Sequence, residues 1–139
     1  MSIHSIVIVD DDPDTLNAMQ RVLTPLGYAV FAASGGREAM RLLNRESVDL
    51  VITDILMPDM DGFELISALR KSHPRTRIIA ISGGRNLSPI SRDTYLVIAR
   101  GFGVDAVLQK PILRNEFVTA IKGVENRSWG SRPRSEHLN

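Results

Sequence analysis

The sequence predicts an α/β protein built on a doubly wound, five-stranded parallel sheet with five helices. Short apolar runs of strand length alternate along the chain with segments whose apolar residues recur at helical spacing. The chain has 139 residues, of which 43% are hydrophobic, so its length suits one domain with a substantial core. These two observations together favour repeated strand-helix-strand units in a single sheet.

Five apolar runs are expected to form the strands. They lie at 6–9, 29–32, 50–53, 78–81 and 106–109. The second run is alanine-rich and weaker than the others, which favours a place at the edge of the sheet.

Five segments of helical period are expected to pack on the sheet. Asp12 can cap the first helix with Pro13 at its first position, and Gly27 can end it. The residues expected to face inward are Leu16, Met19, Leu23 and Leu26; Ala39, Leu42 and Leu43 within 36–44; Leu65, Ile66 and Leu69 between Asp61-Gly62 and His73-Pro74; Tyr95, Ile98, Ala99 and Phe102; and Phe117, Ala120, Ile121 and Val124.

Strict alternation with right-handed crossovers leaves few topologies, and the flavodoxin-like strand order 2-1-3-4-5 fits best. This order places the strands that end at Asp10 and Asp54 side by side. Residues 1–125 are therefore expected to form the domain, and the polar segment 126–139 to be a disordered tail.

Composition excludes several classes of protein. Seventeen basic and sixteen acidic residues give a net charge of +1, which argues against direct binding to DNA. No apolar run approaches the ~20 residues that cross a membrane, and the start of the chain does not resemble a secretory leader. The absence of cysteine fits a reducing compartment, so a soluble cytoplasmic protein is expected.

Polar residues stand where four of the predicted strands end. Asp10 and Asp11 follow the first strand, and Asp54, Ser82 and Lys110 follow the third, fourth and fifth. The C-terminal ends of parallel strands meet at one crevice, so three carboxylates are expected to lie close together and to require a cation. Oxygen ligands favour Mg²⁺, which predicts a site where Asp54 attacks a phosphoryl group held by Lys110 and Ser82.

These residues resemble the receiver domain of two-component response regulators over about residues 3–125. The resemblance is carried by Val9-Asp10-Asp11-Asp12, by Asp54 with Met57-Pro58 and Asp61-Gly62, by Ser82-Gly83 and by Lys110-Pro111. It implies that Asp54 is the phospho-acceptor, that Asp10, Asp11, Asp54 and the Leu56 carbonyl bind Mg²⁺, and that Ser82 and Lys110 assist catalysis. It also implies a cis peptide bond between Lys110 and Pro111, and a histidine of a sensor kinase or phosphotransfer protein as the phosphoryl donor.

The chain departs from the family pattern at three places. One is at Leu56 and Gly84, two residues after Asp54 and Ser82, where the family has residues that tune hydrolysis and this chain has no polar side chain. Val107 stands where the family usually carries the aromatic switch residue that works with Ser82, and Ile112 stands where Phe often follows the Lys-Pro pair. The segment 83–92 is several residues longer than usual and is expected to move on phosphorylation.

The expected function is a single-domain signalling switch that is not an enzyme beyond catalysing its own phosphorylation and slow dephosphorylation. Output through protein contact, onward phosphotransfer or a phosphorylation-dependent dimer is left open. The alternative is a haloacid-dehalogenase-like phosphatase, for which Asp10-Asp11-Asp12 supplies an Asp-x-Asp pattern but no later acidic pair completes the metal site. A flavin-binding module on the same fold would have to place its phosphate in an acidic crevice.

Overall fold

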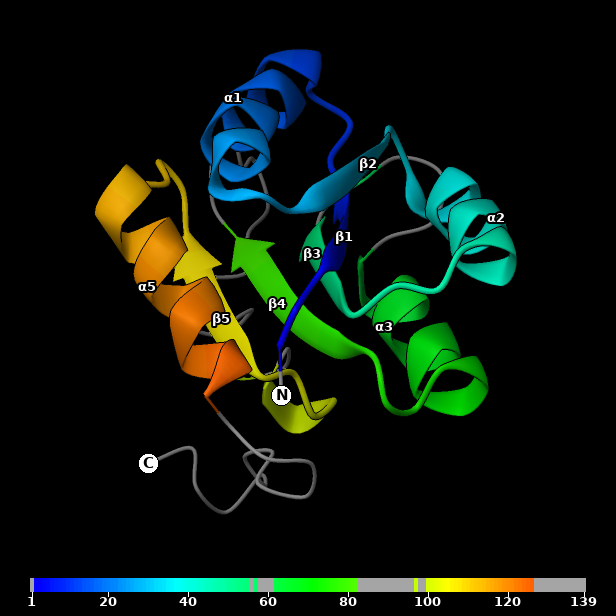
Figure 1. Cartoon of the computed structure of the whole chain (residues 1–139). Helices are drawn as coiled ribbons and strands as arrows, with labels where there is room; N and C mark the ends of the chain where they lie inside the picture. Colours follow the sequence, from blue (N-terminus) through cyan, green and yellow to red (C-terminus); the bar gives the residue numbers. More distant parts are fainter. Residues whose placement is uncertain (1, 56, 58–61, 83–96, 98–99, 127–139) are drawn as a thin grey trace.

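A computed structural model of the chain describes residues 2–55, 57, 62–82, 97, 100–126 (Figure 1). Its centre is one parallel sheet of five strands in the order β2-β1-β3-β4-β5, so the predicted topology is confirmed. The strands are β1 (Ser5–Val9), β2 (Ala29–Ala33), β3 (Leu50–Asp54), β4 (Arg77–Ser82) and β5 (Ala106–Gln109). The alanine-rich β2 lies at an edge, as its weak apolar pattern predicts.

Four helices in the described part of the chain cover the two faces of the sheet. They are α1 (Pro13–Leu23), α2 (Gly36–Arg45), α3 (Gly62–Ser72) and α5 (Arg114–Glu125). Figure 1 shows α1 and α5 on one side and α2 and α3 on the other. Two apolar clusters fill the space between the sheet and the helices, one on each face. Each strand contributes side chains to both clusters because successive residues point to opposite faces.

The helix expected around Tyr95, Ile98, Ala99 and Phe102 falls mostly outside the described residues. Val97, Arg100 and Gly101 have helical backbone. Phe102 was expected to face the core, but its side chain is 38% exposed. Its ring instead stacks at a tilt on Phe63, with centroids 5.6 Å apart. The predicted tail also lies outside the described part of the chain, except for Asn126.

The first helix ends earlier than the sequence pattern predicts. Asp12 caps α1 through the amide of Asp14, but α1 stops at Leu23 and a short 3₁₀ turn covers Thr24–Leu26. Pro25 lacks an amide hydrogen and cannot continue the α-helical bonding, and the tighter turn rotates Leu26 away from the core. Leu26 is consequently 44% exposed, so its predicted place on the buried face was wrong.

Glu125 at the end of α5 joins this helix to the start of the chain. Its carboxylate accepts a hydrogen bond from the Ile3 amide at 3.1 Å and one from the Tyr28 hydroxyl at 3.4 Å. Burial and the nearby Glu125 charge raise the pKa of Tyr28, which keeps the phenol protonated as a donor. The C-terminal end of α5 is thereby fixed beside the N-terminal ends of β1 and β2.

A buried ion pair joins the beginnings of β4 and β5. Arg77 Nη1 lies 3.1 Å from Asp105 Oδ1, and both side chains are almost fully buried. The second Asp105 oxygen accepts a hydrogen bond from the Ile78 amide at 2.8 Å, and the Asp105 amide donates to the Ile78 carbonyl. The pair therefore fixes the register at the end of the sheet that is opposite to Asp54.

Replacing Asp105 with alanine should destabilise the domain strongly. The change leaves the Arg77 guanidinium buried without its carboxylate, for which we expect a loss of about 3–5 kcal/mol in the free energy of unfolding. Chemical denaturation would measure the loss, with Glu46→Ala at an exposed position as the control, expected to change stability by no more than about 0.5 kcal/mol. Equal effects of the two substitutions would contradict a structural role for the pair.

Candidate functional site

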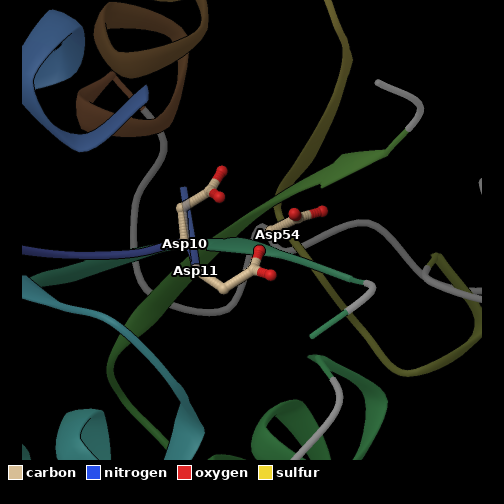
Figure 2. A group of neighbouring side chains, drawn as sticks. All are labelled: Asp10, Asp11 and Asp54. Carbon is tan, nitrogen blue, oxygen red and sulfur yellow. The ribbon is translucent and has the colours of Figure 1, made fainter. Parts of the chain in front are cut away.

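Three carboxylates meet at the C-terminal edge of the sheet. Asp10 and Asp11 follow β1, and Asp54 is the last residue of β3, which is hydrogen-bonded to β1. One oxygen of each carboxylate lies within 4.8 Å of the others (Figure 2). Asp10 is fully buried, Asp54 is 5% exposed and Asp11 is exposed. The site is thus open to solvent on the side of Asp11 and closed beneath Asp10.

The turn after β1 orients the buried carboxylate. Asp10 Oδ1 accepts a hydrogen bond from the Asp12 amide at 2.8 Å. Asp12 in turn accepts bonds from the Asp14 amide and the Thr15 hydroxyl, which fixes it as the N-cap of α1. The cap predicted for Asp12 is confirmed, and it also holds Asp10 in place.

Lys110 lies between two of the carboxylates. Its Nζ is 2.9 Å from Asp10 Oδ2 and 3.2 Å from Asp54 Oδ2, and its side chain is mostly buried. Burial disfavours the charged ammonium, but the short contacts with Asp10 and Asp54 outweigh this effect and raise the pKa of Lys110. Lys110 therefore stays cationic at neutral pH. The peptide bond between Lys110 and Pro111 is cis, as expected.

Two residues that the sequence did not single out fix the backbone at Asp54. The buried Thr53 hydroxyl donates to the Asp54 carbonyl oxygen at 2.8 Å, and the Ile55 amide donates to the Ile81 carbonyl on β4 at 3.0 Å. A hydroxyl residue inside an otherwise apolar strand was the available signal for Thr53. Asp54 is consequently held at a position set by the sheet itself.

Gly62, the first residue of α3, makes close contact with the backbone next to Asp54. Its amide donates to the Ile55 carbonyl at 2.6 Å. A Cβ atom at this position would lie 2.5 Å from the Asp54 carbonyl oxygen and 2.6 Å from Ile55 Cα, and both of these are backbone atoms that cannot move aside. The sequence identified Gly62 as a helix start, but only the structure shows the close approach that requires glycine.

The side chains present fit a hard divalent cation. They offer three carboxylates against one ammonium, which leaves the cluster with excess negative charge. Asp10 Oδ2 is buried and forms an ion pair with Lys110 at 2.9 Å, but within the described part of the chain it has no further hydrogen-bond donor. A buried carboxylate oxygen in this situation gains from coordination to a cation.

The remaining predicted site residues are placed only in part. Ser82 ends β4 and pairs in register with Gln109, and the role of its hydroxyl stays a prediction. Val107 lies in β5 beside Ala80 and is half-buried, with no aromatic ring at that position. The Leu56 carbonyl, Asp61 and the long segment 83–92 lie outside the described residues.

A match to a known family identifies the domain that carries this acidic cluster. Residues 6–122 match the sequence model of the response regulator receiver domain. The chain belongs to this family. It is therefore a receiver domain of the kind found in two-component systems, as its motifs suggested.

Individual relatives agree with this assignment. The chain is 36% identical, over 84% of its length, to the transcriptional regulatory protein GlrR of Escherichia coli. It is 29% identical over 98% of its length to the E. coli transcriptional regulatory protein CpxR. The solved CheY-like receiver of Methanospirillum hungatei superposes with a TM-score of 0.78 and 30% identity, over 90% of this chain and 95% of that one.

The receiver spans only part of the curated regulators that it matches, 25% of GlrR and 55% of CpxR. The family match gives no support to the phosphatase alternative. Within the described part of this receiver, every helix is too short or too polar to reach across a bilayer.

Gly62→Ala should perturb the site, whereas Gly123→Ala should not. The added methyl group at residue 62 meets backbone atoms, and we expect a loss of about 1–3 kcal/mol in the free energy of unfolding. Gly123 lies in α5 with open space around its Cβ position, so alanine there should stabilise the helix by about 0.5–1 kcal/mol. Thermal and chemical denaturation of both variants would test the contrast, and a neutral Gly62→Ala would refute the close approach.

Proposed function

We propose that this receiver is phosphorylated on Asp54 by a histidine kinase or a histidine phosphotransfer protein, with Mg²⁺ as cofactor. The observation that carries the proposal is the position of the Asp54 carboxylate, which lies beside Asp10 and Asp11 and in contact with Lys110. Membership of the receiver family supports a phosphohistidine as the donor.

The transfer would proceed by in-line displacement at phosphorus. One Asp54 carboxylate oxygen attacks, and the new O–P bond forms as the N–P bond to the donor histidine breaks. The donor ring, already protonated on its other nitrogen, takes the electron pair of that bond and leaves as neutral imidazole. The Lys110 ammonium is placed to balance charge on the phosphoryl oxygens, and Ser82 is proposed to donate a hydrogen bond to one of them. Asp10, Asp11, Asp54 and the Leu56 carbonyl would hold Mg²⁺, which supplies positive charge to the phosphoryl group when bound.

The proposed activity stops at one covalent event for each chain. The receiver catalyses its own phosphorylation and slow dephosphorylation, and it is not a turnover enzyme. The likeness to a CheY-like receiver over nearly the whole of that chain supports a stand-alone receiver. We further propose that it works in the cytoplasm and passes its signal by protein contact or onward phosphotransfer, without contacting DNA itself.

Incubation with acetyl phosphate and Mg²⁺ should add one phosphoryl group, detected by intact mass. Asp54→Asn should abolish the adduct, while Asp14→Asn, an exposed aspartate on α1, should leave it unchanged. Lys110→Met should slow its formation by about 10²-fold, because a charge-balancing donor is lost. An adduct that persists in Asp54→Asn would contradict the assignment of the acceptor.

The same incubation should distinguish a switch from an enzyme. We expect stoichiometric labelling and no repeated hydrolysis of a simple phosphate monoester such as p-nitrophenyl phosphate. Many turnovers that survive Asp54→Asn would restore the phosphatase alternative. Size-exclusion chromatography of the labelled protein would show whether phosphorylation produces a dimer.

A further inference from the structure

A hydroxyl group lies inside the core directly before the proposed acceptor. Thr53 is fully buried in β3, where the residues before it are apolar and the residue after it is Asp54. Burying a hydroxyl is unfavourable unless it forms a hydrogen bond. The Thr53 hydroxyl forms this bond by donating to the carbonyl oxygen of Asp54 at 2.8 Å. Its contact is therefore with the main chain of the acceptor and not with the carboxylate.

The ladder on the β1 side of the sheet stops just before the acceptor. β1 ends at Val9, which is in register with Thr53, so the pairing of β1 with β3 ends one residue before Asp54. On the other side, Asp54 is in register with Ile81 of β4. The Thr53 hydroxyl thus binds the Asp54 main chain at the point where the support from β1 has ended.

The start of α3 also confines the main chain at this point. The Gly62 amide donates to the Ile55 carbonyl at 2.6 Å, and a Cβ atom on Gly62 would lie 2.5 Å from the Asp54 carbonyl oxygen. The peptide group between Asp54 and Ile55 is therefore held by the Thr53 hydroxyl and has α3 close beside it. A rotation of this peptide group would move the Asp54 carboxylate relative to its neighbours.

We propose that Thr53 is a positioning residue for phosphorylation, because its hydroxyl keeps the Asp54 carboxylate in place through the Asp54 carbonyl. This inference rests on the proposed role of Asp54 as acceptor. The carboxylate lies beside those of Asp10 and Asp11 (Figure 2) and 3.2 Å from Lys110 Nζ. Groups that orient metal ligands without touching the metal change affinity or activity by about 10- to 100-fold when they are removed.

Two pairs of proteins isolate the hydroxyl. Wild type and Thr53→Val have similar shapes at this position, and Thr53→Ser and Thr53→Ala both lack the methyl group, so one member of each pair keeps the hydroxyl. Phosphorylation by acetyl phosphate at saturating Mg²⁺, followed by intact mass, should be about tenfold slower in the member without it. Equal rates in the serine and alanine variants would overturn the proposal, whether or not the valine variant folds.

Mg²⁺ binding provides a readout that does not depend on phosphoryl transfer. Calorimetric titration should give a dissociation constant for Mg²⁺ about tenfold higher in Thr53→Ala than in Thr53→Ser, because the Asp54 carboxylate is also a proposed ligand. Equal constants in the two variants would contradict the proposal, because the hydroxyl would then not position this carboxylate.

A second buried threonine controls for a general loss of stability. Thr76 precedes β4 at the opposite end of the sheet, and its hydroxyl donates to the Val48 carbonyl at 3.4 Å. Thr76→Val should leave the phosphorylation rate and the Mg²⁺ constant unchanged when it is measured below its thermal unfolding midpoint. A loss as large as that of Thr53→Val would assign both effects to destabilisation and overturn the positioning role.

Asp54→Asn separates this inference from the proposed function. If the adduct persists in Asp54→Asn, the acceptor assignment fails, and the role of Thr53 fails with it. If Asp54→Asn abolishes the adduct but Thr53→Ser and Thr53→Ala react equally fast, the acceptor assignment stands and the role of Thr53 alone is refuted.

Discussion

The concentration of negative charge at one edge of the sheet is the constraint on which the rest of the site depends. Parallel strands deliver Asp10, Asp11 and Asp54 to the same place, with carboxylate oxygens within 4.8 Å of one another. Such a cluster is unfavourable unless cations balance it. Lys110 reaches it from β5, two strands away from β3 in the sheet, and supplies one positive charge. The negative charge that Lys110 does not balance is the reason to expect that the site binds a divalent cation.

Main-chain contacts hold the backbone in place at Asp54, the proposed acceptor. Asp54 pairs with Ile81 of β4, and the Thr53 hydroxyl and the Gly62 amide donate to the carbonyl groups of Asp54 and Ile55. A nucleophile held in this way loses little freedom when it reacts. The absence of a side chain at Gly62 is thus as much a part of the site as the acidic residues.

The sequence predicted that the acidic residues and Lys110 come together, because the apolar runs that mark the strands also show where each strand ends. The order of strands, the convergence of the acids with Lys110 and the cap at Asp12 all followed from apolar runs and their polar neighbours. The exposure of Leu26 did not, because a proline two residues after Leu23 converts the last turn from one helix type to another. The Arg77–Asp105 pair and the Gly62 contact join residues whose sequence neighbours contain no sign of a partner.

The bonds of Glu125 determine from which side the site can be approached. The five-residue strand β1 is about 17 Å long, and Glu125 holds the end of α5 at the N-terminal end of this strand, whereas Asp10 follows its C-terminal end. The Glu125 contacts therefore lie at the opposite end of the sheet from the acidic cluster, so a molecule that approaches the cluster does not meet this end of α5.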